Sequence, residues 1–431
     1  MTSLGSLRFL TAGESHGPAL TVILDGVPAG LRLTLDDIHR DLARRQKGYG
    51  RGRRMEIEHD RARVTAGIRG GLTLGSPIAI EIPNLDYPNW MDVMSPWGDG
   101  SDEQCSPTAG QVATVLTGTA RRDPITMPRP GHADLAGVLK FGHDDMRNVL
   151  ERASARETTA RVAAGAVARR LLAEFGVTIA SHVLCIGGEW APLPDSILTS
   201  PPGPAFLDAV ESSLVRCADT EAAGRMMRRI DEAASLGQTV GGVFQVIAWG
   251  LPPGLGTYTQ WDLRLDGRLA QAVMSIPGVR GAEIGDGFRL AEIMGCAAAD
   301  QMVAKSPEGA TSSAPIADLT GIRRLSNHGG GLEGGMTSGM PLWLGAVMKP
   351  INTMKAPLRS VELGTRREGV AHYERADTCA VPACAVVAEA MVALVLADAF
   401  LAKFGGDSVA EIAARLKVYL DEVAQRCRGS V

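Results

Sequence analysis

The longest apolar stretch of the chain, Ala380–Leu396, constrains the fold more than any other feature of the sequence. It contains Pro382 and Glu389, and Asp398 follows directly after it. A membrane-spanning helix needs about 20 predominantly apolar residues, and a helix that is apolar on every side is otherwise buried inside a protein. We therefore expect a buried core helix that begins near Pro382 and ends at Gly405-Gly406, and no membrane span.

The remaining sequence predicts both strands and helices. Residues 19–25, 77–82, 238–252 and 340–348 read as strands. Helices are expected from Thr34 to about Gln46, from Ser154 to Gly176, and from Asp407, as its cap, to about Ala424. Loops are expected over 92–125 and irregular structure over 186–205. Because strands and helices do not alternate in a steady βαβ rhythm, the predicted class is α+β.

The candidate chemical residues described below lie in every third of the chain, and neither a low-complexity linker nor an internal repeat separates them. We therefore expect a single interwoven domain over residues 1–431. The net charge of −4, with both signs interspersed, gives no sign of a nucleic-acid or membrane partner. The seven cysteines form no Cys-x-x-Cys, and no histidine stands at zinc-ligand spacing, which favours a cytoplasmic protein with reduced cysteines and no metal.

Three short patches combine arginine, histidine and aspartate: 13–17 (Gly-Glu-Ser-His-Gly), 129–134 (Arg-Pro-Gly-His-Ala-Asp) and 375–377 (Arg-Ala-Asp). The glycines beside the histidine of the first patch leave room for a ligand, and the histidine of the second lies next to a fixed positive charge. Together the patches supply proton donors, a carboxylate and anion-binding guanidinium groups. This inventory is typical of proton-coupled chemistry on an anionic small molecule.

The segment 44–54 packs six cations into eleven residues, with glycines between them. It could be a solvated basic loop, or an Arg-Gly segment that binds RNA. It could also be a lid whose guanidinium groups bind phosphate and carboxylate in bidentate fashion.

Two further segments could bind anions. Residues 152–157 place Arg152, Ser154 and Arg156 at a helix start, where free N–H groups favour an anion; the alternative is an ordinary cap with surface arginines. Residues 326–339 hold six glycines in fourteen positions and match neither a Walker loop nor a Rossmann fingerprint. They could form a flexible loop or a backbone cradle for a phosphate or a flat ring.

Taken together and in order, these motifs resemble the chorismate synthase family from about Leu7 to Asp407. The matching segments are 13–17, 44–52, 129–134, 152–158, 283–288, 334–336, 349–351 and 375–382. The resemblance implies a homotetramer with a layered α+β fold of antiparallel sheets and helices. It also implies reduced FMN as cofactor and a 1,4-elimination of phosphate from 5-enolpyruvylshikimate 3-phosphate, which gives chorismate with no net redox change.

The resemblance also implies the site residues. His16 would protonate the departing phosphate, His132 would supply a proton at the reduced flavin, and Asp377 would accept a proton from flavin N5. The substrate carries two carboxylates and a phosphate, which requires a cluster of arginines; the substrate-binding candidates are Arg45, Arg51, Arg54, Arg129 and Arg156. The positions that match flavin contacts are Arg152, Ala153, Ser154, Gln271, Ala272, Gly334, Lys349, Pro350, Ile351, Asn352, Thr353 and Arg375.

Arg45 and Arg51 also match positions assigned to NADPH in family members that reduce their own flavin. Two rival functions stay open at this point: an NADPH-dependent flavin oxidoreductase, and an RNA-binding protein that uses the Arg-Gly segment.

Three positions depart from the common family pattern, namely Gln238, Asn352 and Ala376. The last of these lies directly before Asp377 and could loosen the orientation of that carboxylate.

Overall fold

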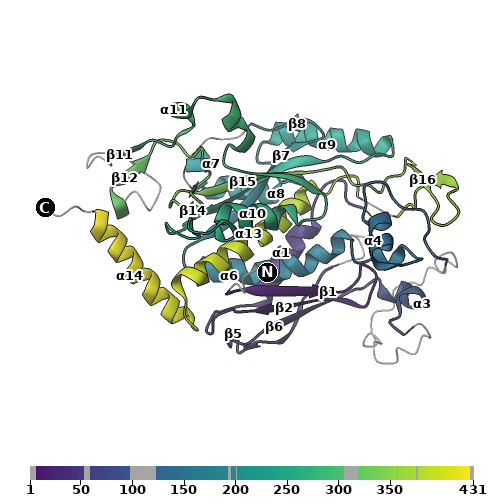
Figure 1. Cartoon of the computed structure of the whole chain (residues 1–431), viewed down its shortest axis with the longest axis horizontal. Helices are drawn as coiled ribbons and strands as arrows, with labels where there is room; N and C mark the ends of the chain where they lie inside the picture. The colour runs from purple at the N-terminus through teal and green to yellow at the C-terminus, as the bar shows by residue number, and fades with distance from the viewer. Residues whose placement is uncertain are drawn as a thin grey trace.

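A computed structural model describes residues 6–52, 59–97, 123–192, 196–199, 201–304, 319–356, 358–374 and 377–427. Two antiparallel sheets enclose a layer of helices (Figure 1). The first sheet has the strand order β1 (Arg8–Ala12), β2 (Ala19–Asp25), β6 (Ile78–Pro83) and β3 (Arg63–Ala66). The second has the order β10 (Val279–Ile284), β15 (Leu342–Met348), β9 (Gly242–Trp249), β7 (Thr178–Ile186) and β8 (Glu189–Trp190).

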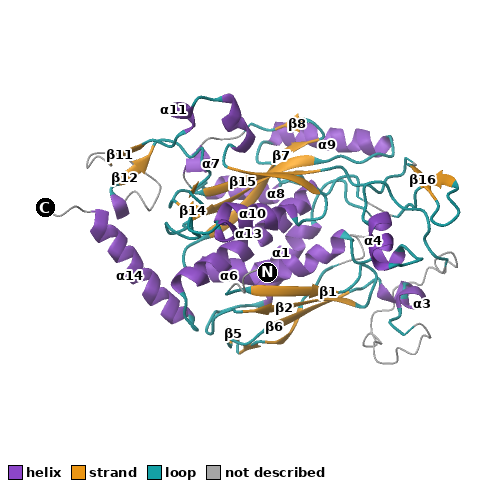
Figure 2. Cartoon of the chain, viewed as in Figure 1, coloured by secondary structure: helices purple, strands orange, loops and turns teal. Residues whose placement is uncertain are grey.

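The helices of the middle layer are α1 (Leu35–Gln46), α6 (Thr158–Glu174), α10 (Leu265–Met274) and α13 (Val381–Phe404). Figure 2 shows them between the strands of the two sheets. α6 packs on β2 of the first sheet, α13 packs on β7 and β9 of the second, and the two helices pack on each other. The main hydrophobic core therefore runs through the helix layer and reaches both sheets.

α13 is the core helix that the apolar stretch predicts. It is long and apolar enough to cross a membrane by length and composition, but 94% of its most apolar window is buried inside the protein. Its close packing on α6 depends on Gly165, since a Cβ at this position would lie 2.3 Å from the Cβ of Ala390.

Smaller elements surround the layers. The helices are α3 (Met91–Met94), α4 (Asp134–Phe141), α5 (Arg147–Leu150), α7 (Ser196–Thr199), α8 (Pro204–Ser212), α9 (Thr220–Ser235), α11 (Gly295–Ala298) and α14 (Val409–Cys427). The 3-10 turns are η1 (Tyr87–Asn89), η3 (Ala155–Glu157), η4 (Trp261–Leu263) and η5 (Gly287–Glu292). The described residues also form four two-stranded sheets: β4 (Ile68–Arg69) with β5 (Leu72–Thr73), β11 (Met302–Ala304) with β12 (Ile322–Arg324), β13 (Leu332–Glu333) with β14 (Met336–Thr337), and β16 (Arg359–Val361) with β17 (Glu368–Val370).

The predicted strands and helices are present in the structure, but several begin or end at other residues than predicted. α1 begins as expected, because Thr34 and Asp37 form a reciprocal capping box. Ser154 instead caps the 3-10 turn η3, and the side chain of Glu157 binds Thr11 and Arg161, so no capping box forms there. The hydroxyl of Ser408 accepts a hydrogen bond from the N–H of Glu411, so Ser408 and not Asp407 caps α14.

Two segments expected to be irregular contain regular structure. Residues 92–94 belong to α3, and 98–122 lie outside the described residues. Between 186 and 205 the chain forms β8, α7 and the first residues of α8. These elements are two to nine residues long, which is too short for periodicity to reveal.

Candidate active site

Arg129, His132 and Asp134 form one connected cluster at the start of α4. The Asp134 carboxylate is fully buried and accepts hydrogen bonds from the Arg129 side chain at 2.8 and 3.0 Å. It also lies 2.5 Å from Nδ1 of His132. Burial alone would raise the pKa of Asp134, but the bonds from His132 and Arg129 hold it well below its usual range. The carboxylate therefore stays ionised and fixes the ring of His132.

The strand end 349–353 lies directly against this cluster. Arg129 Nη1 donates to the Thr353 hydroxyl at 3.2 Å, and the amide of Asn352 donates to the carbonyl of Pro130 at 2.5 Å. Lys349 Nζ donates to the carbonyl of Gly131 at 2.8 Å and to Oδ1 of Asn352. Two motifs more than 200 residues apart are thus joined in one place.

The ammonium group of Lys349 lies among neutral acceptors. Burial lowers the pKa of its ammonium group, and the neighbouring charge of Arg280 lowers it further. Two cations held close together are stabilised by a bound anion. This donor set therefore fits a phosphate group.

His16 is held from several sides. Its Nδ1 lies 2.8 Å from Oε1 of Glu151, and its backbone N–H donates to Oε2 of the same carboxylate at 2.8 Å. The ring stacks on Trp90, with ring centroids 3.7 Å apart. Asn84 directly follows β6, and its side chain donates to the carbonyls of Ser15 and Gly17 and so fixes the loop around the histidine.

The segment 152–154 reaches the same loop from the other side. Arg152 donates to the carbonyls of Thr11 and Gly13, and the hydroxyl of Ser154 donates to that of Ser15 at 3.1 Å. Ala153 lies between them and is half-buried. Arg152, like Lys349, therefore presents a cation whose hydrogen-bond partners include neutral oxygens.

Arg45 and Arg156 flank a buried carboxylate. Arg156 Nη1 donates to Oδ1 of Asp60 at 2.6 Å, and Arg45 Nη1 lies 3.6 Å from Oδ2. All three residues are buried, and Arg45 also donates to Thr158 and to the carbonyl of Ala155. Asp60 thus holds the two predicted substrate-binding arginines side by side.

Asp377 ties the basic segment to the start of α13. Its Oδ2 lies 2.8 Å from Arg51 Nη1, and its Oδ1 accepts a hydrogen bond from the N–H of Gly52 at 2.7 Å. Arg54 and Arg375, predicted to bind substrate and flavin, lie outside the described residues.

Three further positions that match flavin contacts lie on α10 and in the turn between β13 and β14. Gln271 is exposed and Ala272 buried near the end of α10, and Gly334 is exposed in the turn between β13 and β14. Within the part of the chain that the structure describes, no hydrogen bond or ion pair joins these three positions to Arg129 or His132. Pro350 and Ile351, by contrast, lie with Lys349 and Thr353 at the end of β15.

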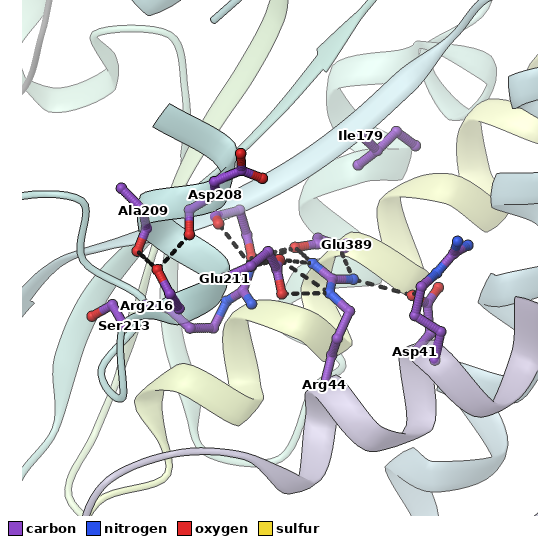
Figure 3. A network of polar contacts seen from close by, with 12 residues as sticks. Asp41, Arg44, Ile179, Asp208, Ala209, Glu211, Ser213, Arg216 and Glu389 are labelled. Atoms are coloured by element: carbon purple, nitrogen blue, oxygen red, sulfur yellow. Dashed lines mark hydrogen bonds and ion pairs between the residues drawn. The ribbon is translucent and has the colours of Figure 1, made fainter. Parts of the chain in front are cut away.

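The helix that carries Arg45 is anchored by a buried charge network (Figure 3). Arg44 donates from Nη1 and Nη2 to the two oxygens of Glu389, each at 2.8 Å. Arg169 and Arg216 approach the same carboxylate at 3.2 and 3.1 Å, and Glu211 and Asp41 bind the guanidinium groups from outside. The network fixes the C-terminal end of α1, and so the backbone of Arg45, against α13.

The sequence did not predict a role for the carboxylates that contact the predicted site residues. Glu151, Asp60 and Glu374 each lie against a predicted site residue, and Glu374 comes within 3.5 Å of Arg129. Burial would raise the pKa of Glu374, but a hydrogen bond from His372 and the charges of Arg129 and His16 lower it. Glu374 thus binds both Arg129 and His372. The one available signal was the position of Glu151, directly before the Arg-Ala-Ser-Ala-Arg-Glu segment.

Comparison with known proteins identifies the family of this chain. The family model of chorismate synthase matches residues 7–401. A chorismate synthase of Thermobifida fusca (strain YX) is 50% identical over 421 residues, which cover 97% of this chain and 100% of the relative. One of Leifsonia xyli subsp. xyli (strain CTCB07) is 50% identical over 419 residues, or 97% of each chain. The chain belongs to the chorismate synthase family.

A solved structure described as a crystal structure of chorismate synthase superposes with a TM-score of 0.73 at 37% identity and covers 97% of this chain and 98% of its own. The predicted α+β class of antiparallel sheets and helices is thereby confirmed. The activity is that of chorismate synthase, a carbon–oxygen lyase of the shikimate pathway. This assignment replaces both rival functions, the flavin oxidoreductase and the RNA-binding protein.

Proposed function

We propose that the protein eliminates phosphate from 5-enolpyruvylshikimate 3-phosphate with reduced FMN as cofactor, and that it works as a cytoplasmic homotetramer of one interwoven domain per chain. The observation that carries the proposal is the convergence of distant motifs. The strand end 349–353 lies against the cluster of Arg129, the segment 152–154 lies against the loop of His16, and Asp60 joins Arg45 to Arg156.

The substrate is a multiply charged anion, and the site offers cations on several elements. Arg129 comes from the loop before α4, Arg45 and Arg51 from the end of α1 and the loop after it, and Arg156 from η3. Guanidinium groups bind carboxylate and phosphate through two parallel hydrogen bonds, and each charge-assisted bond contributes about 1.5–3 kcal/mol. Two or three such bonds would orient the substrate.

The cation donors described above fit FMN as well. Lys349 and Arg152, together with Ser154, Asn352 and Thr353, would hold its phosphate and polar ring edge. When bound, reduced FMN supplies the electron-rich ring that assists the loss of phosphate.

The chain's own residues would move the protons. His16 would give a proton from its ring to the oxygen of the departing phosphate. His132, whose Nδ1 is fixed by Asp134, would supply a proton at the flavin from Nε2. Asp377 would accept a proton at a carboxylate oxygen. In the whole reaction one C–O bond and one C–H bond break, and the products are chorismate and phosphate. General acid–base roles of this kind each contribute about 10²–10⁴-fold.

An anaerobic assay tests the proposal. Protein, dithionite-reduced FMN and 5-enolpyruvylshikimate 3-phosphate are mixed, and chorismate absorbance and phosphate release are followed together. Equal amounts of both products, many per flavin and without consumption of reductant, are expected. Reductant consumed once per turnover would refute the redox-neutral elimination. Repeating the assay with NADPH and oxidised FMN shows whether the protein reduces its own flavin.

A further inference from the structure

Glu151 makes an unusual pair of contacts with a single residue. Its side chain is 1% exposed, and its two carboxylate oxygens bind the ring and the backbone of His16, each at 2.8 Å. The backbone carbonyl of Glu151 also accepts a hydrogen bond from the N–H of Ser15 at 3.0 Å. One buried residue thus fixes both the loop and the ring that it carries.

The chemistry of this contact decides which ring nitrogen carries the proton. An ionised carboxylate only accepts hydrogen bonds, so the ring nitrogen that faces it must donate. Nδ1 of His16 is therefore the protonated nitrogen of the neutral ring, and Nε2 is the nitrogen that can accept a proton or, once charged, deliver one.

The face of the ring is fixed as well. Trp90 stacks on it with an angle of 24° between the planes, and the indole N–H donates to Asp86 at 3.0 Å. The Asn84 side chain, two residues before Asp86, holds the backbone on both sides of His16. The ring can therefore neither flip nor tilt without breaking a contact on one of its sides.

We propose that Glu151 is the positioning residue of His16: it sets the Nδ1–H tautomer and aims Nε2 at the departing phosphate, while Trp90 holds the plane of the ring. The proposal rests on the proposed function of His16 as proton donor. Glu151 itself acts through His16 and does not touch the substrate.

A double-mutant cycle separates positioning from general support of the fold. E151A is expected to lower kcat about 10²-fold, the low end of the contribution of a general acid, with KM changed less than about threefold. E151Q keeps one accepting oxygen and should fall between E151A and the wild type. In the H16A background, E151A should lower kcat no further, because its effect passes through the histidine.

D398N is the matched control. Asp398 is also buried, and it also binds a backbone N–H, that of Leu7 at 2.7 Å, and a charged side chain, that of Arg268. Its kcat should equal that of the wild type. A loss of kcat from E151A that is as large in H16A as in the wild type would overturn the proposal for Glu151 alone. A wild-type rate in H16A would overturn the role of His16 and the proposal with it.

The tautomer can be measured without turnover. Solid-state ¹⁵N NMR of protein labelled at histidine, with H16A to identify the signal, should show the neutral ring of His16 protonated at Nδ1. In E151A the signal should shift toward the Nε2–H form. An unchanged tautomer in E151A would show that another group sets it and would refute the proposal.

Discussion

Replacing Glu389 by glutamine should reveal what the buried network of Figure 3 contributes to stability. Burial alone would raise the pKa of Glu389, but the charges of Arg44, Arg169 and Arg216 lower it from 4.5 to about 2. Each tenfold change in proton affinity corresponds to about 1.4 kcal/mol, so this difference corresponds to about 3 kcal/mol of native-state stabilisation. Removal of one partner of a buried ion pair costs about 3–5 kcal/mol, because it leaves the other charge uncompensated.

The E389Q variant is therefore expected to lose about 3–5 kcal/mol in the free energy of unfolding at pH 7. The assay is equilibrium unfolding in urea followed by tryptophan fluorescence. E368Q is the matched control, because the Glu368–Arg359 pair has the same 2.8 Å separation as the Glu389–Arg44 pair but side chains 73% and 88% exposed. An exposed pair of this kind contributes about 0–1 kcal/mol, so E368Q should unfold near the wild type.

The pH dependence gives a second, independent criterion. The folded-state pKa of Glu389 is lowered, so its contribution is fully present above its ordinary pKa of 4.5 and is lost as the pH falls toward about 2. The gap between wild type and E389Q should stay constant from pH 7 to about pH 5 and then shrink. Equal effects of E389Q and E368Q at pH 7, or a gap that does not change down to pH 2.5, would refute the reasoning.

Three further outcomes follow from the described contacts. G165A should destabilise the protein by about 1–3 kcal/mol in the same urea assay, because its methyl group would overlap Ala390. G224A on α9 should leave stability equal or higher, because its methyl group would meet only the end of the Arg228 side chain, at 3.7 Å. Burial raises the pKa values of Cys379 and Cys384 to about 12, so iodoacetamide at pH 7.5 should label the exposed Cys296 and Cys427 and spare these two, as read by peptide mass spectrometry; early labelling of Cys379 would contradict this. D377A should lower kcat about 10²–10⁴-fold and speed trypsin cleavage after Arg51, because it removes the contacts that hold Gly52 and Arg51. D377N should restore part of the protease resistance, because its side-chain oxygen can still accept a hydrogen bond from Gly52. Cleavage of D377A at the wild-type rate would show that Asp377 does not hold this segment in place.

Local signals were enough to predict the elements whose stabilising interactions are local. The capping box of Thr34 and Asp37 lies within four residues, and it set the start of α1 correctly. The apolar run after Pro382 predicted α13 because burial on all sides requires no specific partner. The short helices α3 and α7 were missed for the converse reason, since four residues show no periodicity and tertiary packing alone stabilises them.

The partners of the charged residues could not be predicted in this way. Glu389 was visible in the sequence as an interruption of the apolar run, but Arg44 lies 345 residues before it and Arg216 173 residues before it. No spacing rule connects residues that meet only when α1, α13 and the loop before α9 are packed together. The family resemblance supplied the identities of the site residues, and it carried no information on which carboxylate each of them would meet.

These carboxylates change the electrostatics that the motifs suggest. Counting cations alone, the segments 44–54, 129–134 and 152–157 predict a strongly positive site. In the structure Asp60 lies between Arg45 and Arg156, and Asp134 binds Arg129.

Each such carboxylate neutralises one positive charge and also fixes the direction of a guanidinium group. Part of the side-chain entropy is therefore lost when the protein folds, and less is lost when the ligand binds. The net positive charge available to anionic ligands must then come chiefly from cations with neutral partners. Among the described residues Lys349 meets this condition with the carbonyl of Gly131 and the side chain of Asn352. Arg152 meets it in part, since it donates to two carbonyls and lies 3.9 Å from Glu157.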